Sequence, residues 1–211
     1  MSLFGSLALL TLVTCCCFGQ SWEVGVAAGY SFYHNATITN PVASAQAGFN
    51  SGVAASAELG QDIGDHFGGE LRYTFLDGGS QLRFAGQEAN MAAIAHAVHY
   101  DFLLYTAPKS SKVRPYLAAG GGVKYYVATG AETDSQPLSN FAFLTHTREV
   151  EGLLSAGGGL KMKVSEHWLL RVDFRYYATP FPQSLLTPAP NAKVNGWLHD
   201  FVPLAGFAWT F

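Results

Sequence analysis

The chain has 211 residues, of which 49% are hydrophobic, 14% aromatic and only 13% charged. Ordinary soluble domains carry about 25% charged residues, so this chain has too little charge to cover a surface that meets water on all sides. The length fits one domain, and a formal net charge of −3 provides no basic surface for nucleic acid, so we expect no nucleic-acid partner.

The first 20 residues are an apolar run with small residues near its end, which is typical of a secretory signal peptide. We expect cleavage after Gly19, with cleavage after Gln20 as the alternative. All three cysteines, Cys15 to Cys17, leave with this segment. The barrel domain, 21–211, is therefore expected to hold no disulfide, thiol nucleophile or cysteine metal site. It contains no run of about 18 uncharged apolar residues, which argues against a membrane helix.

From Trp22 onward, bulky apolar residues alternate with small or polar ones, and this period of two predicts β-strands. In the second of these segments Phe49 falls on the bulky face. In the last one Pro203 interrupts the pattern and predicts a bulge. Eight such segments follow one another, at residues 22–32, 49–59, 66–75, 94–105, 116–128, 150–162, 168–176 and 197–211.

The connections between these segments alternate between long and short. This rhythm favours an up-and-down barrel, and its strands are long enough to cross a bilayer at a tilt, which takes about 9 to 11 residues. We expect the prolines of residues 180–193 to keep that loop out of any sheet. The long connections are 33–48, 77–87, 129–148 and 178–193, and the short ones are 61–65, 106–114 and 165–167.

The remaining question is which face of the strands points outward. An eight-stranded barrel is only wide enough inside for a modest set of side chains. Rows of large rings and branched chains would overfill it, so the bulky face must look outward, where lipid accepts it. The sequence therefore predicts an all-β fold, an eight-stranded antiparallel up-and-down transmembrane β-barrel. The rival fold is a secreted soluble barrel that holds a ligand in its core.

With these features the chain resembles the small OmpA-type eight-stranded outer-membrane barrels of Gram-negative bacteria over residues 22–211. The end of the chain, "HDFVPLAGFAWTF", resembles the signal that the outer-membrane assembly machinery recognises, carried by Phe207, Trp209 and Phe211. A second segment, "PYLAAGGGVKYY", looks like a strand common in that family.

The resemblance implies a location in the outer membrane of a Gram-negative bacterium, with the long loops extracellular and both termini periplasmic. Partners would be outer-membrane lipid, lipopolysaccharide and the assembly machinery, and we expect a monomer. The family includes stabilisers, adhesins, narrow conduits and a few lipid-modifying enzymes, so the fold alone does not settle the function. We expect a structural or surface-interaction role, with a surface ligand held by the long loops. The alternatives are a narrow small-solute conduit and a lipid-modifying enzyme.

Charged residues concentrate on the inner face of the predicted strands. Because buried charges need partners, we expect them to form a salt-bridged plug in the lumen. The residues of this predicted lumen charge network are Glu23, Glu58, Glu70, Arg72, Asp101, Lys124, Glu151, Lys161, Arg171, Asp173, Arg175 and Asp200.

Two short turns predict how parts of this network pair. The turn after the second strand should bring Glu58 near Glu70, with Arg72 one diagonal step away to bridge them. A tight turn at 165–167 should set Lys161 opposite Arg171. It should also set the small residues Gly157 and Gly159 opposite Arg175 and Asp173, which leaves room for the long side chains.

The sequence offers few candidates for catalysis. His96 and His99 are three residues apart on a strand and face opposite sides, so they cannot share a metal. His99 and Asp101 share a face, where we expect an internal hydrogen bond. His34 and Ser51 flank the first long loop and are the nearest approach to a Ser/His pair, but no carboxylate completes it. We expect neither an enzyme nor a cofactor.

Overall fold

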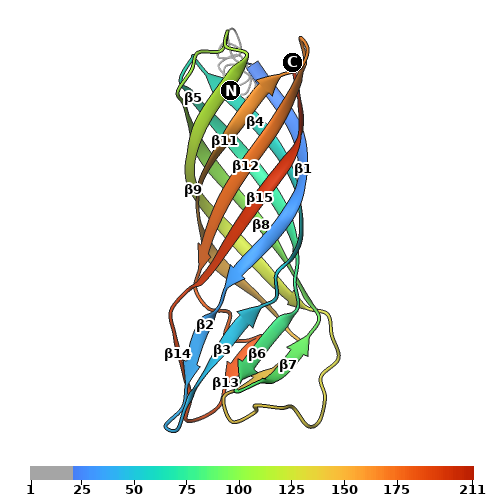
Figure 1. The fold of residues 1–211 in the computed structure, drawn as a ribbon, viewed down its shortest axis with the longest axis vertical. Coiled ribbons are helices and arrows are strands. Elements are labelled where there is room, and N and C mark those ends of the chain that lie inside the picture. Colours follow the sequence, from blue (N-terminus) through green and yellow to red (C-terminus); the bar gives the residue numbers. More distant parts are fainter. Residues whose placement is uncertain (1–20) are drawn as a thin grey trace, which may run out of the picture.

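Eight long strands close into an antiparallel barrel, and seven short strands lie beyond one end of it (Figure 1). The structure is a computed structural model and describes residues 21–211, so the expected signal peptide lies outside the described residues. Within the described part no helix is long and apolar enough to cross a membrane. The barrel strands are β1 (Ser21–His34), β4 (Gly52–Ile63), β5 (Phe67–Asp77), β8 (Ala93–Tyr105), β9 (Val113–Ala128), β11 (Arg148–Lys163), β12 (Trp168–Thr179) and β15 (Leu198–Thr210).

Each barrel strand pairs with the barrel strand before it and the one after it, so the prediction of an eight-stranded up-and-down barrel is confirmed. The order around the barrel is β1-β15-β12-β11-β9-β8-β5-β4. The ring closes between the first and last strands, where Trp22 and Phe211 exchange two backbone hydrogen bonds of 3.2 and 3.0 Å. The chain therefore begins and ends its barrel at the same end, where the connections are short (Figure 1).

The bulge predicted at Pro203 is absent. Gly29 pairs with Leu204 on one side of the proline and Phe32 with Phe201 on the other, so the same register runs through it. On the opposite edge Phe174 pairs with Pro203 itself. The missing N–H of the proline thus costs some pairing with β1 and inserts no extra residue.

Burial alternates along the barrel strands as the sequence pattern predicts. In β8, Phe102 is 70% exposed while its neighbour Asp101 is fully buried. The outer wall carries most of the exposed bulky residues, and the charged side chains point into the lumen. A barrel with an apolar outer face and a polar interior is suited to contact with lipid.

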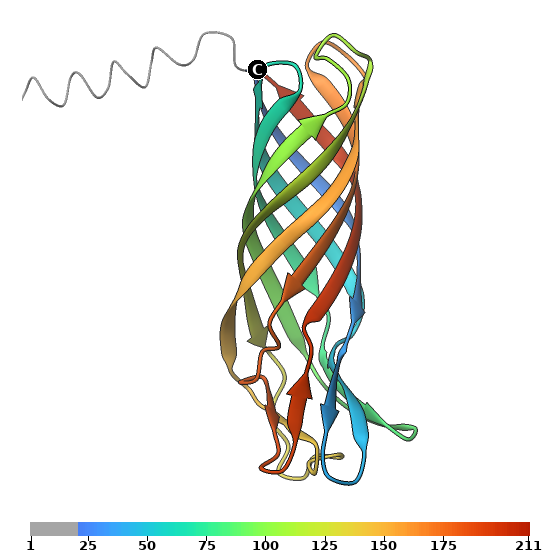
Figure 2. The same ribbon diagram turned by 90° about the vertical axis from the view of Figure 1, so that its left-hand side faces the viewer.

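Four long connections fold into sheets of their own instead of remaining loops (Figure 2). Five strands form the sheet β14-β2-β3-β6-β7, which we call the loop sheet, and two more pair as β10 and β13. The strands are β2 (Ala36–Thr39), β3 (Ser44–Phe49), β6 (Ser80–Phe84), β7 (Gln87–Met91), β10 (Ala142–Leu144), β13 (Leu186–Pro188) and β14 (Lys193–Asn195).

The expectation that residues 180–193 stay out of any sheet is wrong. Leu186–Pro188 pairs with β10, and Lys193 begins the strand that pairs with β2. Both strands are three residues long and lie at sheet edges, where a proline such as Pro188, the last residue of β13, leaves few ladder hydrogen bonds to lose.

The hairpin of β6 and β7 turns through only two residues, Ala85 and Gly86, between the paired Phe84 and Gln87. Both turn residues have positive φ, 47° and 82°, as a tight hairpin with right-handed twist requires. This geometry fixes the register of the two strands and projects the hairpin away from the barrel (Figure 2).

The loop sheet has an apolar core that continues into the mouth of the barrel. Ile38 and Leu82 are fully buried, and the Phe84 ring packs on Phe141 at 4.9 Å between centroids. Phe49 belongs to this core: it ends β3, is 1% exposed and stacks on Tyr126 at 4.9 Å. The prediction that Phe49 lies on the outward face of the second barrel strand is therefore wrong. β3 ends at Phe49 and β4 begins at Gly52, so the alternation of the barrel strand does not extend back to Phe49.

Candidate functional site

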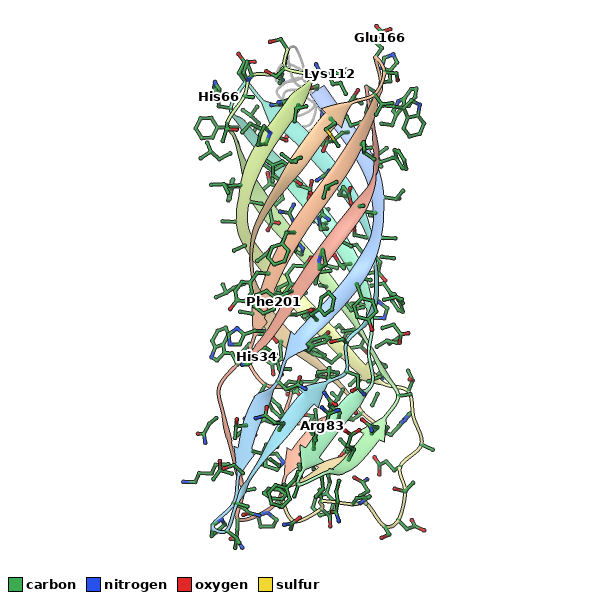
Figure 3. The ribbon with its side chains drawn as sticks, viewed as in Figure 1. His34, His66, Arg83, Lys112, Glu166 and Phe201 are labelled. Atoms are coloured by element: carbon green, nitrogen blue, oxygen red, sulfur yellow. The ribbon has the colours of Figure 1, made fainter. Side chains whose placement is uncertain are left out.

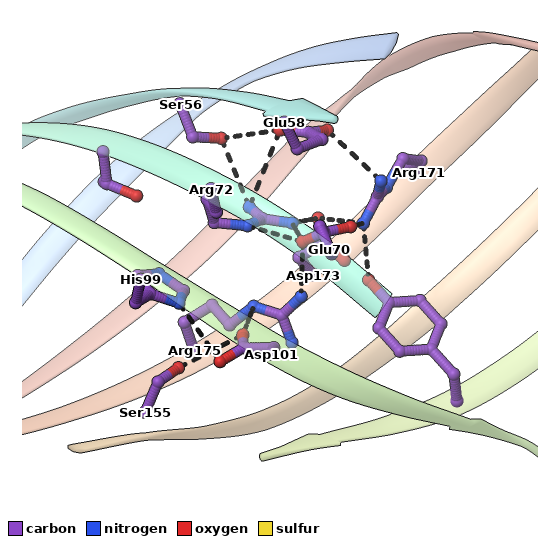
Figure 4. A network of polar contacts seen from close by, with 12 residues as sticks. Ser56, Glu58, Glu70, Arg72, His99, Asp101, Ser155, Arg171, Asp173 and Arg175 are labelled. Carbon is purple, nitrogen blue, oxygen red and sulfur yellow. Dashed lines mark hydrogen bonds and ion pairs between the residues drawn. The ribbon is translucent and has the colours of Figure 1, made fainter. Parts of the chain in front are cut away.

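The lumen is filled by charged side chains that meet across the barrel (Figure 4). Eleven of the twelve residues of the predicted lumen charge network lie there, none more than 5% exposed. They are Glu23, Glu58, Glu70, Arg72, Asp101, Lys124, Lys161, Arg171, Asp173, Arg175 and Asp200. Buried charges are tolerated only with partners, so the contacts among these side chains decide whether the lumen is plugged or open.

Glu70 is the centre of the network. Its carboxylate accepts hydrogen bonds from Nε of Arg72 at 2.8 Å, Nη2 of Arg171 at 2.6 Å and Nη2 of Arg175 at 3.0 Å. Arg171 and Arg175 come from β12, which lies four places from β5 in the ring of eight strands. The hydrogen bonds from Arg171 and Arg175 to Glu70 therefore cross the full width of the lumen. A second crossing joins Arg72 Nη2 to Asp173 Oδ2 at 2.9 Å.

Arg72 lies between two carboxylates of neighbouring strands, although its register differs from the expected one. Glu58 is directly opposite Arg72 in the ladder, and Gly60 is opposite Glu70. Arg72 Nη1 lies 3.9 Å from Glu58 Oε2 and donates to Ser56 Oγ at 3.3 Å. The expected diagonal bridge is thus a direct cross-strand pair of Arg72 with Glu58, and Glu70 lies two residues before Arg72 on the same strand.

The predicted pairing of β11 with β12 agrees with the register of the structure. Gly157 is opposite Arg175, Gly159 opposite Asp173 and Lys161 opposite Arg171. A Cβ on Gly157 would lie 2.2 Å from the carbonyl oxygen of Phe174. No larger residue fits there unless the backbone moves.

A second layer of the lumen lies towards the end where the chain enters and leaves the barrel. Lys161 Nζ donates to Glu23 Oε1 at 2.5 Å and to the hydroxyl of Tyr105 at 2.6 Å. Arg114 Nη1 donates to Asp62 Oδ2 at 2.6 Å. A cavity of about 210 Å³ opens at this end and reaches Glu23 and Lys161.

Sequence reasoning missed Asp62 and Arg114 because both were assigned to short turns. The strands run further than predicted: β4 ends at Ile63 and β9 begins at Val113. The signal was present, since Asp62 has the same parity as Glu58 and Arg114 the same parity as Lys124.

A third layer lies towards the loop sheet and combines one ion pair with several hydroxyls. Lys124 Nζ donates to Asp200 Oδ2 at 2.9 Å, and Ser31 Oγ donates to Asp200 Oδ1 at 2.5 Å. The lysine ammonium also lies 4.7 Å from the ring centre of Tyr33 and 5.3 Å from that of Tyr126. Sequence reasoning gave no role to these tyrosines, although Tyr126 shared the inner parity with Lys124.

Glu151 does not join the network. It pairs with Lys124 in the strand register, but the lysine turns to Asp200, and no ion pair to Glu151 forms within residues 21–211. It is half-buried near the loop end of β11, beside Glu149. Its inner parity was read correctly, but the cation opposite it, Lys124, is already paired with Asp200.

The network is not fully satisfied. Buried atoms without a hydrogen-bond partner, among those the structure describes, include Glu58 Oε1, Arg171 Nε, Asp173 Oδ1 and two nitrogens of Arg175. Arg175 Nε is 3.6 Å from Asp101 Oδ2, which is an ion-pair distance. The unsatisfied atoms lie at the level of Glu70, so the centre of the lumen is the place where water has polar partners.

The histidine and serine candidates do not assemble a catalytic group. His99 Nδ1 lies 3.1 Å from Asp101 Oδ1 and its Nε2 lies 3.0 Å from the hydroxyl of Tyr177, as an internal hydrogen-bonded pair would. His34 and Ser51 line the same surface groove, but no hydrogen bond joins them. Within residues 21–211 no group of three potential metal ligands comes together.

The outer wall carries the three residues of the predicted assembly signal. Phe207 is 54% exposed, Trp209 37% and Phe211 67%, all on the outward face of β15 or just after it. The Trp209 ring packs on Trp168 at 5.1 Å. Figure 3 shows the side chains that cover the barrel wall, with Phe201 of the same strand near the loop end.

Comparison with known proteins agrees with this architecture. Neisserial surface protein A has 15% identity and a TM-score of 0.55, covering 92% of this chain and 99% of that one. OprG from Pseudomonas aeruginosa has 14% identity and a TM-score of 0.54, covering 90% and 95%. The outer membrane protease OmpT from Escherichia coli has 10% identity and a TM-score of 0.51, covering 90% and 97%. At these identities the likeness shows the fold alone.

No curated protein matches the chain. The model of the outer membrane protein beta-barrel domain family matches residues 6–198, which is most of the sequence. The chain therefore belongs to the outer membrane protein beta-barrel domain family.

Proposed function

We propose that the protein is a sealed outer-membrane barrel that presents a folded loop sheet at the cell surface, with a role in envelope structure or surface interaction. The observation that carries this proposal is the set of ion pairs across the lumen, above all those of Glu70 with Arg171 and of Arg72 with Asp173. A barrel of eight strands has little room inside, and here that room is taken by side chains that hold one another.

The orientation in the membrane follows from the lengths of the connections. Barrels of this class have short periplasmic turns and longer extracellular loops. We therefore place the loop sheet outside the cell and both barrel ends of the chain, Ser21 and Phe211, on the periplasmic side. Lipid and lipopolysaccharide surround the exposed bulky face, and the closed ring of strands leaves no barrel edge for a second copy, which favours a monomer.

The outward stripe of Phe207, Trp209 and Phe211 is proposed as the signal for the outer-membrane assembly machinery. The stripe is exposed to the surroundings in the folded barrel, so its rings are not required for lumen packing.

The loop sheet is the part of the molecule suited to a surface role. Its strands come from three separate connections, and its buried Ile38, Phe49 and Leu82 hold it as one rigid unit on the barrel. Rigid scaffolds that present polar groups are a common basis for binding. We propose no catalytic activity, because His34 and Ser51 share a groove without a hydrogen bond and without a carboxylate partner.

A narrow conduit is the second candidate, and one observation favours it. Arg175 Nε and Nη1 and Asp173 Oδ1 have no hydrogen-bond partners in the centre of the lumen. An exchange of ion-pair partners around these atoms would be needed to open a path. The cavity at the terminal end stops at the layer of Glu23 and Lys161, which supports the sealed barrel over the conduit.

The surface role is tested by trimming the loop sheet. Residues 36–49 and 80–91 are replaced by short turns, and attachment of expressing cells to glass, mucin and cultured epithelial cells is compared with that of the full-length protein. The proposal predicts an intact barrel, seen as heat-modifiable gel migration, together with lost attachment. Unchanged attachment by cells that carry the trimmed barrel would contradict a surface-interaction role.

A further inference from the structure

A groove lies where the loop sheet meets the barrel mouth, and it is separate from the lumen charge network. Its volume is about 370 Å³, near the lower limit of pockets that hold small ligands. Figure 3 marks its two sides with His34 on β1 and Arg83 on the loop sheet. The residues that define it are His34, Asn35, Gln46, Asn50, Gln81 and Arg83.

The groove is lined by carboxamides with unused hydrogen-bonding capacity. The Gln46 side chain is exposed and makes no hydrogen bond within residues 21–211. Gln81 is only 9% exposed, and its Nε2 donates to the carbonyl of Phe49 at 3.1 Å while its Oε1 has no partner. Asn35 Oδ1 accepts from the backbone N–H of Phe49 at 2.9 Å, and this leaves its NH₂ group to donate.

This inventory matches a ligand rich in hydroxyl groups. A hydroxyl donates one hydrogen bond and accepts others, and a carboxamide does the same with its NH₂ and its carbonyl. Exposed His34 adds a ring face at one side of the groove, and half-buried Tyr33, which packs on Phe49 at 5.5 Å, lines that side. Sugars present both hydroxyls and flat C–H faces, so amides beside an aromatic ring suit them.

The charge of the groove argues against an anionic ligand. Its one permanently charged residue is Arg83, whose Nε lies 2.6 Å from Glu88 Oε1. This pair is exposed and neutral overall. A sulfated or phosphorylated chain needs several unpaired cations, and the groove offers none.

We infer that this groove binds a neutral saccharide chain from outside the cell. The inference rests on the proposed surface role of the loop sheet and gives that role a class of ligand. The amides of β3 and β6 hydrogen-bond the sugar hydroxyls, and the rings at the barrel mouth pack against the sugar face.

The test uses the purified full chain in phospholipid nanodiscs on an array of neutral oligosaccharides of glucose, galactose, mannose and N-acetylglucosamine, with sulfated equivalents alongside. Gln46→Ala is the informative variant because its side chain makes no internal hydrogen bond, so the fold should persist. Gln87→Ala is the matched control: it is another exposed glutamine of the loop sheet and lies outside the groove. Binding to at least one neutral oligosaccharide should fall at least tenfold in Gln46→Ala and stay unchanged in Gln87→Ala.

Three results would overturn the inference: no binding to any neutral oligosaccharide, a preference for the sulfated chains, or equal binding by wild type and Gln46→Ala. Loss of binding in nanodiscs that contain lipopolysaccharide would assign the groove to the membrane's own glycolipid and would also overturn it. If cells attach through the loop sheet while the array stays blank, the saccharide inference fails and the surface role stands. If trimming the loop sheet leaves attachment unchanged, the surface role itself fails.

Discussion

Glu70 of β5 and Arg171 of β12 face each other across the full width of the barrel, and Oε2 of the glutamate lies 2.6 Å from Nη2 of the arginine. Strands on opposite walls share no backbone hydrogen bonds, so side chains alone connect them through the lumen. The ion pair acts as a strut, and it also occupies the space through which a solute would pass.

Removing the charge of Glu70 should destabilise the barrel strongly. Glu70→Gln leaves three buried guanidinium groups, those of Arg72, Arg171 and Arg175, around a neutral amide. Breaking a buried ion pair on one side costs about 3 to 5 kcal/mol, because the remaining charge is left without compensation. Urea unfolding in lipid vesicles, followed by heat-modifiable gel migration, measures the loss.

The matched control for this variant is Glu88→Gln. Glu88 also pairs with an arginine, Arg83, but both side chains are about half exposed. An exposed pair contributes at most about 1 kcal/mol, so this variant should unfold close to the wild type. Equal effects of the two substitutions would contradict the role of Glu70 as the centre of the network.

Glycines of the inner face should be less tolerant than glycines of the outer face. A Cβ on Gly120 would lie 1.9 Å from the carbonyl oxygen of Tyr100, whereas a Cβ on Gly152 meets nothing within 4 Å. Gly120→Ala should therefore reduce the yield of folded protein, because the ladder to β8 must shift. Gly152→Ala should leave the yield unchanged or slightly raised. The folded fraction after refolding into vesicles gives the comparison, and equal yields would show that the β8–β9 ladder accommodates the added methyl group.

Phe49 should couple the loop sheet to the barrel. Phe49→Ala removes the ring that stacks on Tyr126 and leaves a cavity, which costs about 3 to 5 kcal/mol for a buried phenylalanine. We expect the loop sheet to become sensitive to protease while the barrel stays folded. Phe143→Ala is the control, because that ring is 43% exposed in β10. Protection equal to that of the control would mean that the sheet does not depend on this contact.

The terminal aromatic residue should matter for assembly more than for stability. Phe211→Ser keeps the two backbone hydrogen bonds with Trp22 and removes only the ring, which is 67% exposed. The amount of protein in the outer membrane should fall several-fold, whereas refolding of the purified variant in detergent should match the wild type. A parallel loss in both assays would assign Phe211 to the fold instead of to recognition.

The barrel and its polarity were predictable because both follow from local alternation. A strand with bulky residues on one face reads the same in the sequence as in the structure, and short turns then set which residues meet, as with Lys161 and Arg171. The same alternation, followed to the observed strand ends at Ile63 and Val113, would have added Asp62 and Arg114 to the lumen.

The parts that could not be predicted depend on contacts between distant segments. β14 pairs with β2, although more than 150 residues separate them, and three-residue strands such as β13 carry almost no periodic signal. The partner of Lys124 was equally hidden: the register offers Glu151, but the lysine reaches across the lumen to Asp200. Only the closed barrel brings that aspartate within reach.

Planar-bilayer conductance of the purified protein at high salt tests the sealed lumen most directly. Because Glu70, Arg72, Arg171 and Asp173 pair across the barrel, the account predicts no ion current through the protein over the full range of applied voltage. Discrete, reproducible current steps from the unaltered protein would contradict it.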